Sequence, residues 1–315
     1  MSHPALYLPV GSQEESFENA EVVARLYDAF VEGDVQRTLE CFAPDALHHV
    51  PGRGLNAGDY WGHAGVTRFM ENVRHHYGGL WVISVPVLSV HGDDAFTREI
   101  LRINRAHDPG RVWTLRIANR FKIRAGKISE SWVIPEDQRE YDEYWSEPFE
   151  PVARPTTIIR HDPAARVVDV ERAVSTENTT LLREMYRRFW RNDLGAIREL
   201  FAEDVVVNIV GRSELSGIYE GWEGFLEFRN TLMSLAGNKY KLDVVAVAGS
   251  ANDVWATEHI RMNRAWDPAL AELLVQMHFE VQNGKVVRMN DFPFDTYAWE
   301  SFYTRPSNEV IEGAL

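Results

Sequence analysis

The sequence predicts an α+β protein of two tandem, cone-shaped domains, each with N-terminal helices packed on a curved, mostly antiparallel sheet. The first observation is an internal repeat, because RINRAHDP at 102–109 recurs as RMNRAWDP at 261–268. The second is the order within each copy, where helical spacing comes first and alternating strands follow. Copies of this length are too long for solenoid repeats, so each holds its own core. Helices followed by an antiparallel meander give the α+β class.

The repeat extends over nearly the whole of each copy. Tyr27 in RLYDAFVEGD matches Tyr186 in EMYRRFWRND, and CFAPD at 41–45 matches LFAED at 200–204. The proline-containing segment between the copies is too long for a loop inside a compact domain. The sequence therefore predicts a polar tail, a first domain, a linker, a second domain and a final tail, at residues 1–16, 17–146, 147–175, 176–305 and 306–315.

Each copy begins with helices. Apolar side chains recur at helical spacing in the first copy at Val23, Leu26, Tyr27 and Phe30, and in the second at Leu182, Met185, Tyr186 and Phe189. A second short helix, a short strand and a third helix follow. We expect the short strands at 46–50 and 205–210, and the third helices at 65–73 and 224–232.

Four β-rich runs complete each copy. They lie at 81–90, 95–105, 112–124 and 127–135, and at 240–248, 254–264, 271–282 and 285–293. The last two runs of the second copy are joined by Asn283-Gly284, and Asn-Gly between alternating strands is a strong signal for a two-residue hairpin.

Composition excludes several classes of protein. The chain has 315 residues, of which 45% are hydrophobic, which is enough for two packed cores. Its formal net charge of −14 argues against nucleic acid or a membrane surface as a partner. Cys41 is the single cysteine, so an intrachain disulfide is excluded, and we expect it to be a small buried side chain. The first residues lack the pattern of a secretion signal, and the expected location is the cytoplasm.

The order of elements, the FAxD motifs before the first strands and the hairpin motif NGKVVRMNDFPFD at 283–295 resemble the nuclear transport factor 2-like superfamily. The closest likeness is to its SnoaL-like members, the polyketide cyclases, beside ketosteroid isomerase and limonene epoxide hydrolase. The resemblance implies a cone with a deep, mostly apolar pocket for a small hydrophobic molecule. Members often dimerise through the outer face of the sheet, so the duplication implies an intrachain pseudo-dimer, and a further homodimer stays open.

The last hairpin of the second copy carries the leading site hypothesis. With a two-residue loop, regular pairing places His278 opposite Met289 and Gln276 opposite Asp291, all on one face. His278 and Asp291 are then diagonal neighbours. Burial raises the pKa of such a carboxyl towards neutrality, so the pair could transfer a proton. By the resemblance, Asp291 lies where SnoaL-like cyclases carry an acidic catalytic residue.

An alternative reading places this pair in solvent. The opposite face of the hairpin is the more apolar, with Val275, Met277, Phe279, Val281, Val286 and Phe292. Asp291 and His278 line the pocket only if this apolar face docks on the other domain.

The first copy has Arg120 and Val133 at the positions equivalent to His278 and Asp291. It is then either a degenerate scaffold, which we favour, or a site of different chemistry built from Arg120, Glu99 and His49.

Further candidates for substrate contacts surround the expected pockets. Glu99 and Glu258 match between the copies, and each is either a pocket acid or a strand-end residue paired with an arginine. His259 points away from Glu258 on a regular strand. The remaining candidates are a polar side chain on the first strand and aromatic side chains flanking the third helices, namely Asn208, Tyr219, Trp222 and Trp61.

The sequence contains no metal-ligand spacing, nucleophile elbow or nucleotide-binding loop, so we expect neither metal nor cofactor. The favoured function is a cofactor-free enzyme that acts on a small hydrophobic, polyketide-like or polycyclic molecule by cyclisation or isomerisation. In this hypothesis Asp291 is the general acid/base and His278 orients or shares the proton. The alternatives are a non-catalytic small-molecule-binding or scaffold protein, and an epoxide hydrolase.

Overall fold

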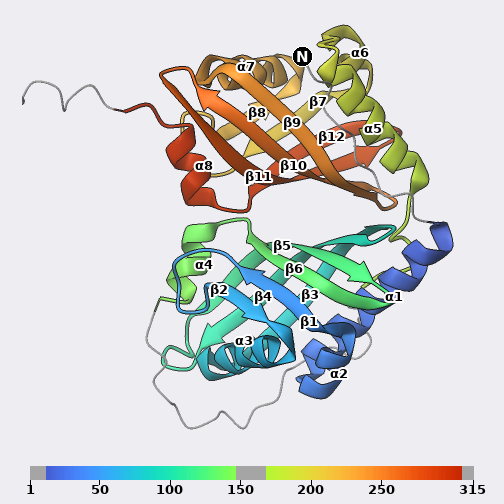
Figure 1. Ribbon diagram of the computed structural model, residues 1–315, viewed down its shortest axis with the longest axis vertical. Coiled ribbons are helices and arrows are strands. Elements are labelled where there is room, and N and C mark those ends of the chain that lie inside the picture. The colour runs from blue at the N-terminus through green and yellow to red at the C-terminus, as the bar shows by residue number, and fades with distance from the viewer. Residues whose placement is uncertain (1–11, 147–167, 307–315) are drawn as a thin grey trace, which may run out of the picture.

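The computed structural model describes residues 12–146 and 168–306, which form two similar domains, coloured blue to green and yellow to red in Figure 1. In each domain, helices cover one face of a six-stranded sheet, and the opposite face of the sheet turns towards the other domain (Figure 1). The predicted α+β class with two tandem domains is therefore confirmed. The expected tails and linker fall largely on residues 1–11, 147–167 and 307–315, outside the described residues.

The first domain contains four helices and six strands among the described residues. Helix α1 begins inside the expected tail, because Ser12 caps it by accepting a hydrogen bond from the Glu15 N–H at 3.0 Å. The elements are α1 (Gln13–Glu32), α2 (Val35–Cys41), β1 (Phe42–Val50), β2 (Gly58–Trp61), α3 (Gly62–His76), β3 (Tyr77–His91), β4 (Asp94–Arg105), β5 (Val112–Arg124), β6 (Lys127–Pro135) and α4 (Gln138–Tyr144).

The second domain repeats the same order. Hydrophobic spacing predicted neither the second short strand nor the closing helix of either domain. The elements are α5 (Thr176–Trp190), α6 (Leu194–Glu199), β7 (Phe201–Ile209), β8 (Gly217–Glu220), α7 (Gly221–Leu235), β9 (Ala236–Gly249), β10 (Asp253–Arg264), β11 (Asp267–Gln282), β12 (Lys285–Pro293) and α8 (Thr296–Phe302).

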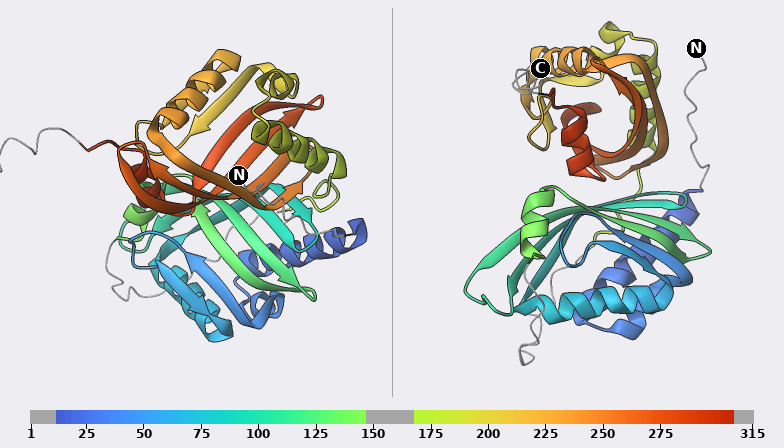
Figure 2. Two further views of the ribbon diagram at one scale, coloured as in Figure 1. Left: turned by 45° about the horizontal axis from the view of Figure 1, so that its top comes forward. Right: turned by 60° about the vertical axis from the view of Figure 1, so that its left-hand side comes forward.

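The two sheets have the same topology, β2-β1-β6-β5-β4-β3 and β8-β7-β12-β11-β10-β9. The first long strand pairs in parallel with the last one, β1 with β6 and β7 with β12, and the other neighbours are antiparallel. Each sheet curves around its helices, as the right-hand view of Figure 2 shows for the second domain. The curvature produces a separate hydrophobic core on the helix-covered face of each sheet.

The predicted hairpin at Asn283-Gly284 is confirmed. Both residues have positive φ, 53° and 72°, as a two-residue hairpin turn of this type requires. The strands beyond it are not in regular register, because the pairing shifts between Glu280 and Val281. The same irregularity recurs in the first domain between Lys122 and Ile123. A single extra residue exchanges the two faces of a strand relative to its partner, so this shift decides which side chains share the pocket.

The domains meet through the outer faces of their sheets in a nearly two-fold arrangement. Phe96 on β4 and Trp255 on β10 occupy equivalent positions in the repeat, and their rings stack on each other with centroids 6.2 Å apart and planes 7° apart. Both side chains are 0% exposed. Contact between equivalent residues is the signature of an isologous interface, here within one chain.

The closing helices α4 and α8 repeat this symmetry at one end of the interface. Arg139 of α4 forms an ion pair with Glu300 of α8. In the reciprocal contact, Tyr297 of α8 donates a hydrogen bond to Asp142 of α4 at 2.8 Å. These contacts and the apolar sheet faces make the two domains the intrachain pseudo-dimer that the resemblance implied.

Candidate active site

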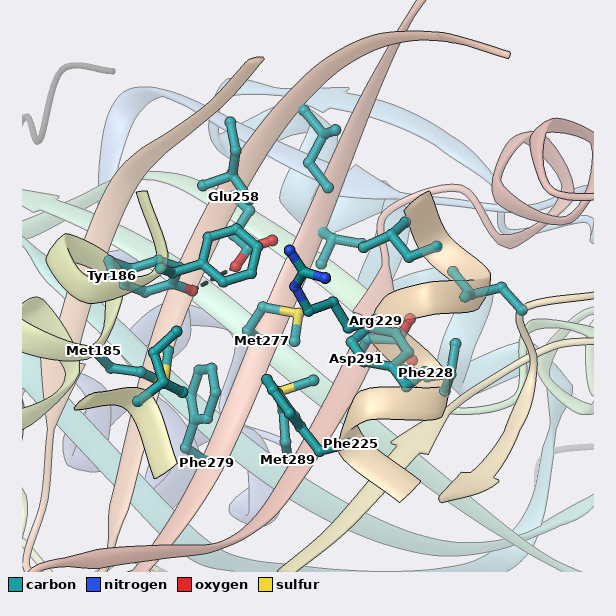
Figure 3. Close-up of a pocket in the computed structure, with 18 of the residues that line it drawn as sticks. Met185, Tyr186, Phe225, Phe228, Arg229, Glu258, Met277, Phe279, Met289 and Asp291 are labelled. Atoms are coloured by element: carbon teal, nitrogen blue, oxygen red, sulfur yellow. Dashed lines mark hydrogen bonds between the residues drawn. The ribbon is translucent and has the colours of Figure 1, made fainter. Parts of the chain in front are cut away.

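The second domain encloses a pocket between the concave face of its sheet and helices α5, α7 and α8 (Figure 3). It contains about 780 Å³ of empty space, counting the part open to solvent. Its walls are mostly apolar, and two carboxyl groups, those of Asp291 and Glu258, face into the pocket. The apolar wall includes Phe225, Phe228, Met277, Phe279 and Met289, labelled in Figure 3.

Asp291 on β12 is 1% exposed. One carboxyl oxygen, Oδ1, accepts a hydrogen bond from the Val210 N–H at 2.7 Å. The other, Oδ2, has no hydrogen-bond partner among the described residues. Burial, with a smaller contribution from the nearby Glu258 carboxyl, raises the pKa of Asp291 to about 8 against the opposing effect of the backbone hydrogen bonds. At neutral pH this side chain is therefore mainly a neutral acid with one free oxygen.

Glu258 on β10 is held by the first helix of its domain. The Tyr186 hydroxyl of α5 donates a hydrogen bond of 2.5 Å to Glu258 Oε1, drawn as a dashed line in Figure 3. Burial raises the pKa of Glu258 to about 7, and the hydrogen bond from Tyr186 limits this rise because it stabilises the ionised form. Glu258 is therefore divided between its acid and base forms near neutral pH.

The two carboxyl groups are held apart by the sheet. Strand β11 lies between β10 and β12, so the backbones that carry Glu258 and Asp291 are separated by roughly 10 Å. Both side chains line the same pocket. Burial raises the pKa of both carboxyl groups, so both can take part in proton transfer near neutral pH.

The expectation that His278 and Asp291 share one face is wrong. Because of the register shift, Asp291 pairs with Met277, and His278 pairs with Asn290. His278 therefore lies on the outer face, against the first domain, where its ring stacks on Trp255 with centroids 4.2 Å apart. Its Nε2 lies 2.8 Å from an Asp253 carboxyl oxygen.

On β11 the pocket is also formed by the opposite face from the one expected, whereas on β12 the expected side chains Met289 and Asp291 line it. Met277, Phe279 and Met289 line it, whereas the mixed face with Gln276 and His278 is buried against the first domain. The apolar face of β11 is therefore the pocket wall and not the docking face, whereas on β12 Phe292 of the expected apolar face packs between the domains.

Two other expected contacts lie outside the pocket of the second domain. Asn208 lies on the outer face, where its amide donates to Asn290 at 3.4 Å. His259 also points outwards and lies 3.4 Å from a carboxyl oxygen of Glu272.

Two aromatic candidates lie behind the pocket wall. Tyr219 donates a hydrogen bond to the Leu215 carbonyl at 2.9 Å and packs on Phe228. Trp222 stacks on Phe225 with ring centroids 4.9 Å apart. Both side chains support the aromatic residues that form the wall and do not themselves line the pocket.

The first domain contains a pocket of nearly the same size, about 760 Å³ on the same measure. Glu99 lies in it and accepts hydrogen bonds from the Tyr27 hydroxyl and the Asn119 amide, both at 3.2 Å. Burial raises the pKa of Glu99 to about 7. His48 also lines this pocket. We favoured a degenerate scaffold for the first domain. That expectation did not include buried polar groups in its pocket.

The other residues expected in the first site are elsewhere. His49 is on the opposite side of β1 from His48, and its ring nitrogens lie 2.8 Å from Asp59 and 3.1 Å from Glu130. Arg120 on the outer face pairs with the buried Asp94 at 3.0 Å. Trp61 is 66% exposed.

Sequence reasoning missed Tyr27 and Tyr186 as pocket groups, although both open the repeat that defined the two copies. Their recurrence at matching positions was a usable signal, but a tyrosine at helical spacing is also an ordinary core residue. Arg229 at the second pocket was missed as well, since nothing in its sequence surroundings marks it.

Among residues 12–146 and 168–306, no group of three or more His, Cys, Asp or Glu side chains is arranged to hold a metal ion. Within the same residues, no helix combines the length and the apolar character needed to span a membrane.

Comparison with known protein families is decisive for the classification. The family described as "SnoaL-like domain" matches residues 23–131 and 182–289, one match in each half and together more than half of the chain. The chain belongs to the SnoaL-like family. It is thus a tandem SnoaL-like protein of the nuclear transport factor 2-like superfamily, as the resemblance implied.

Single relatives match about one domain of this tandem protein. An uncharacterized protein of Mycobacterium tuberculosis is 27% identical over 127 residues, 40% of this chain and 95% of that protein. Bal32a, from a soil-derived mobile gene cassette, is 25% identical with a TM-score of 0.39, covering 42% of this chain and 98% of its own. A nuclear transport factor 2-like protein of unknown function from Burkholderia pseudomallei is 21% identical with a TM-score of 0.38, covering 42% of this chain and 100% of its own.

Proposed function

We propose that this SnoaL-like protein is an enzyme that moves a proton at carbon in a small hydrophobic carbonyl compound, in the pocket of its second domain. The single observation that carries the proposal is the free, buried Oδ2 of Asp291 in the same apolar pocket as Glu258. A buried polar atom without a partner requires an explanation, and a hydrogen bond to bound substrate provides one.

The roles follow from the hydrogen bonds of each carboxyl group, because Tyr186 stabilises the ionised form of Glu258 and Asp291 Oδ2 is free to contact a substrate. Asp291, with a pKa of about 8, donates a hydrogen bond to the substrate carbonyl oxygen. Glu258, with a pKa of about 7, removes a proton from the adjacent carbon in its ionised form. The electron pair of the broken C–H bond forms a carbon–carbon double bond, the π pair of the carbonyl group moves to its oxygen, and the proton of Asp291 passes to that oxygen to give an enol.

Two outcomes of this enol are consistent with the pocket. In a substrate with a conjugated double bond, return of the proton from Glu258 to a different carbon gives an isomerisation. Alternatively, the enol carbon attacks a second carbonyl group, whose oxygen takes the proton held by Glu258 while the enol proton returns to Asp291, and the result is an aldol-type cyclisation. Neither step needs an oxidant, a reductant or a cofactor. The mostly apolar walls favour a polycyclic or polyketide-like substrate, because few polar groups in them could hydrogen-bond a sugar or a nucleotide.

The test uses proton exchange on a simple probe. Wild-type protein with 2-tetralone in D₂O should exchange the proton next to the carbonyl group faster than buffer alone, as followed by NMR. Asp291→Asn and Glu258→Gln should each slow this exchange by about 100-fold or more.

The matched control is Glu99→Gln, the same substitution at the equivalent position of the first domain. It should leave the exchange rate near the wild-type value. Equal losses in Glu99→Gln and Glu258→Gln would contradict the assignment to the second domain. Binding of 2-tetralone in this pocket without any exchange would instead support the binding-protein alternative.

A further inference from the structure

The two pockets share one polar pair and differ in their other polar groups. In the first domain, Tyr27 donates a hydrogen bond to Glu99 at 3.2 Å. In the second, Tyr186 donates to Glu258 at 2.5 Å. These four residues occupy equivalent positions in the repeat and line their pockets in the same way.

The second polar group of each pocket lies on a different strand in the two domains. Where the second domain has Asp291 on β12, the first has the apolar Val133 on β6. Where the second domain has the fully buried Val207 on β7, the first has His48 on β1. The first pocket therefore lacks the carboxyl group of Asp291 and contains an imidazole instead, so the two pockets offer different polar groups to a ligand.

His48 is buried and only half satisfied. Its side chain lines the pocket, it is 9% exposed, and its Nδ1 lies 2.8 Å from the Ser131 hydroxyl. Its Nε2 is buried without a hydrogen-bond partner among the described residues. The Phe69 ring packs on the imidazole with centroids 4.5 Å apart and fixes its orientation. An oriented, buried nitrogen with no partner at a cavity wall indicates a ligand atom.

The surroundings define the ligand. Burial lowers the pKa of His48 to about 3, so the imidazole is neutral and offers no charge to an anion. A neutral imidazole nitrogen is a donor or an acceptor according to its tautomer, and a hydroxyl group can pair with either form. The remaining wall is rich in aromatic rings, with Phe69, Trp81, Phe121, Tyr141 and Trp145. Such walls favour a flat aromatic molecule.

The first pocket lies close to the surface of its domain on one side. An outer hollow on the surface of the first domain shares Phe30, Met70, Val73 and Trp81 with the pocket. This hollow also includes the side chains of Glu71 and Arg74 on α3. The side of the pocket between α3 and the start of β3 thus lies next to a surface hollow.

We propose that the first domain is a second ligand site, which binds an uncharged aromatic alcohol by a hydrogen bond between its hydroxyl group and His48 Nε2. The two domains of this protein then take different ligands, and the first is not a bare scaffold. This proposal does not depend on proton transfer in the second domain.

The probe is 2-naphthol, with naphthalene as the matched compound that lacks the hydroxyl group. Indole N–H signals in ¹H–¹⁵N NMR distinguish the pockets, because Trp81 and Trp145 line the first and Trp299 lines the second. We expect 2-naphthol to shift the Trp81 and Trp145 signals, and to bind the first pocket at least several-fold more tightly than naphthalene.

The variant is His48→Val, since the second domain carries Val207 at the equivalent position. It should weaken 2-naphthol binding at the first pocket about tenfold and leave naphthalene binding unchanged. Asp291→Asn should leave both affinities in this pocket unchanged, so failure of the enzyme proposal can be told apart from failure of this one. Unshifted Trp81 and Trp145 signals would overturn the proposal. If His48→Val does not fold, equal wild-type affinities for the two compounds would also overturn it.

Discussion

Replacing Asp291 with asparagine should stabilise the protein and, in the proposed mechanism, inactivate it. The two side chains have nearly the same shape, and the asparagine Oδ1 can still accept the Val210 N–H bond that Asp291 accepts at 2.7 Å. The variant replaces the buried, unpartnered Oδ2 of Asp291 with an amide nitrogen, so the side chain can no longer ionise. A gain in stability at the cost of function is typical of strained functional groups.

The size of the effect follows from the pKa. In the folded protein the pKa of Asp291 is about 8, against 3.8 for an unperturbed aspartate. As pH rises from about 4 to about 8, the unfolded chain releases this proton while the folded protein keeps it, so wild-type stability falls over this window. The fall is at most about 5 kcal/mol in total, and about 4 kcal/mol of it lies between pH 5 and 8.

The assay is urea unfolding of both proteins at pH 5, 6.5 and 8. The difference in unfolding free energy should grow with pH, with Asp291→Asn the more stable protein. Other groups such as Glu258 titrate in both proteins, so most of their effect cancels in the difference. Parallel pH dependences would refute the raised pKa and with it the role of Asp291 as an acid.

Three further variants test the remaining contacts. Tyr186→Phe removes the hydrogen bond that holds the pKa of Glu258 near 7, so the acid limb of the pH–rate profile should move up by about one pH unit. His278→Gln should keep the wild-type rate of 2-tetralone exchange, because His278 faces the other domain. A large loss of rate would show that His278 takes part in the reaction. Trp255→Ala removes a fully buried ring at the domain interface, and calorimetry should show about 3–5 kcal/mol less stability.

Local chemistry was enough to predict the repeated architecture. The duplicated motifs, the helix spacing around Tyr27 and Tyr186, and the Asn283-Gly284 turn are properties of short segments, and the structure confirms the fold that they indicated. Alternation along one strand also separated Glu258, which faces the pocket, from His259, which faces outwards. These inferences held because each depends on neighbours within a few residues.

The active-site pairing depended on contacts between segments. A register shift between Glu280 and Val281 exchanges the faces of β11 relative to β12, and it left His278 on the opposite side from Asp291. A shift of one residue costs little locally, but it reverses every side chain beyond it, because strand side chains alternate with a period of two.

Docking of the domains was likewise decided by tertiary structure. In the middle of the second sheet both faces are buried, one against its helices and one against the first domain, so Gln276 and His278 are 0% exposed although they are polar. Hydrophobic patterning assumes that one face of a sheet meets solvent, and it cannot identify the pocket face when neither does. The amino-acid order thus determined the two similar domains, whereas strand register and domain packing decided which side chains line each pocket.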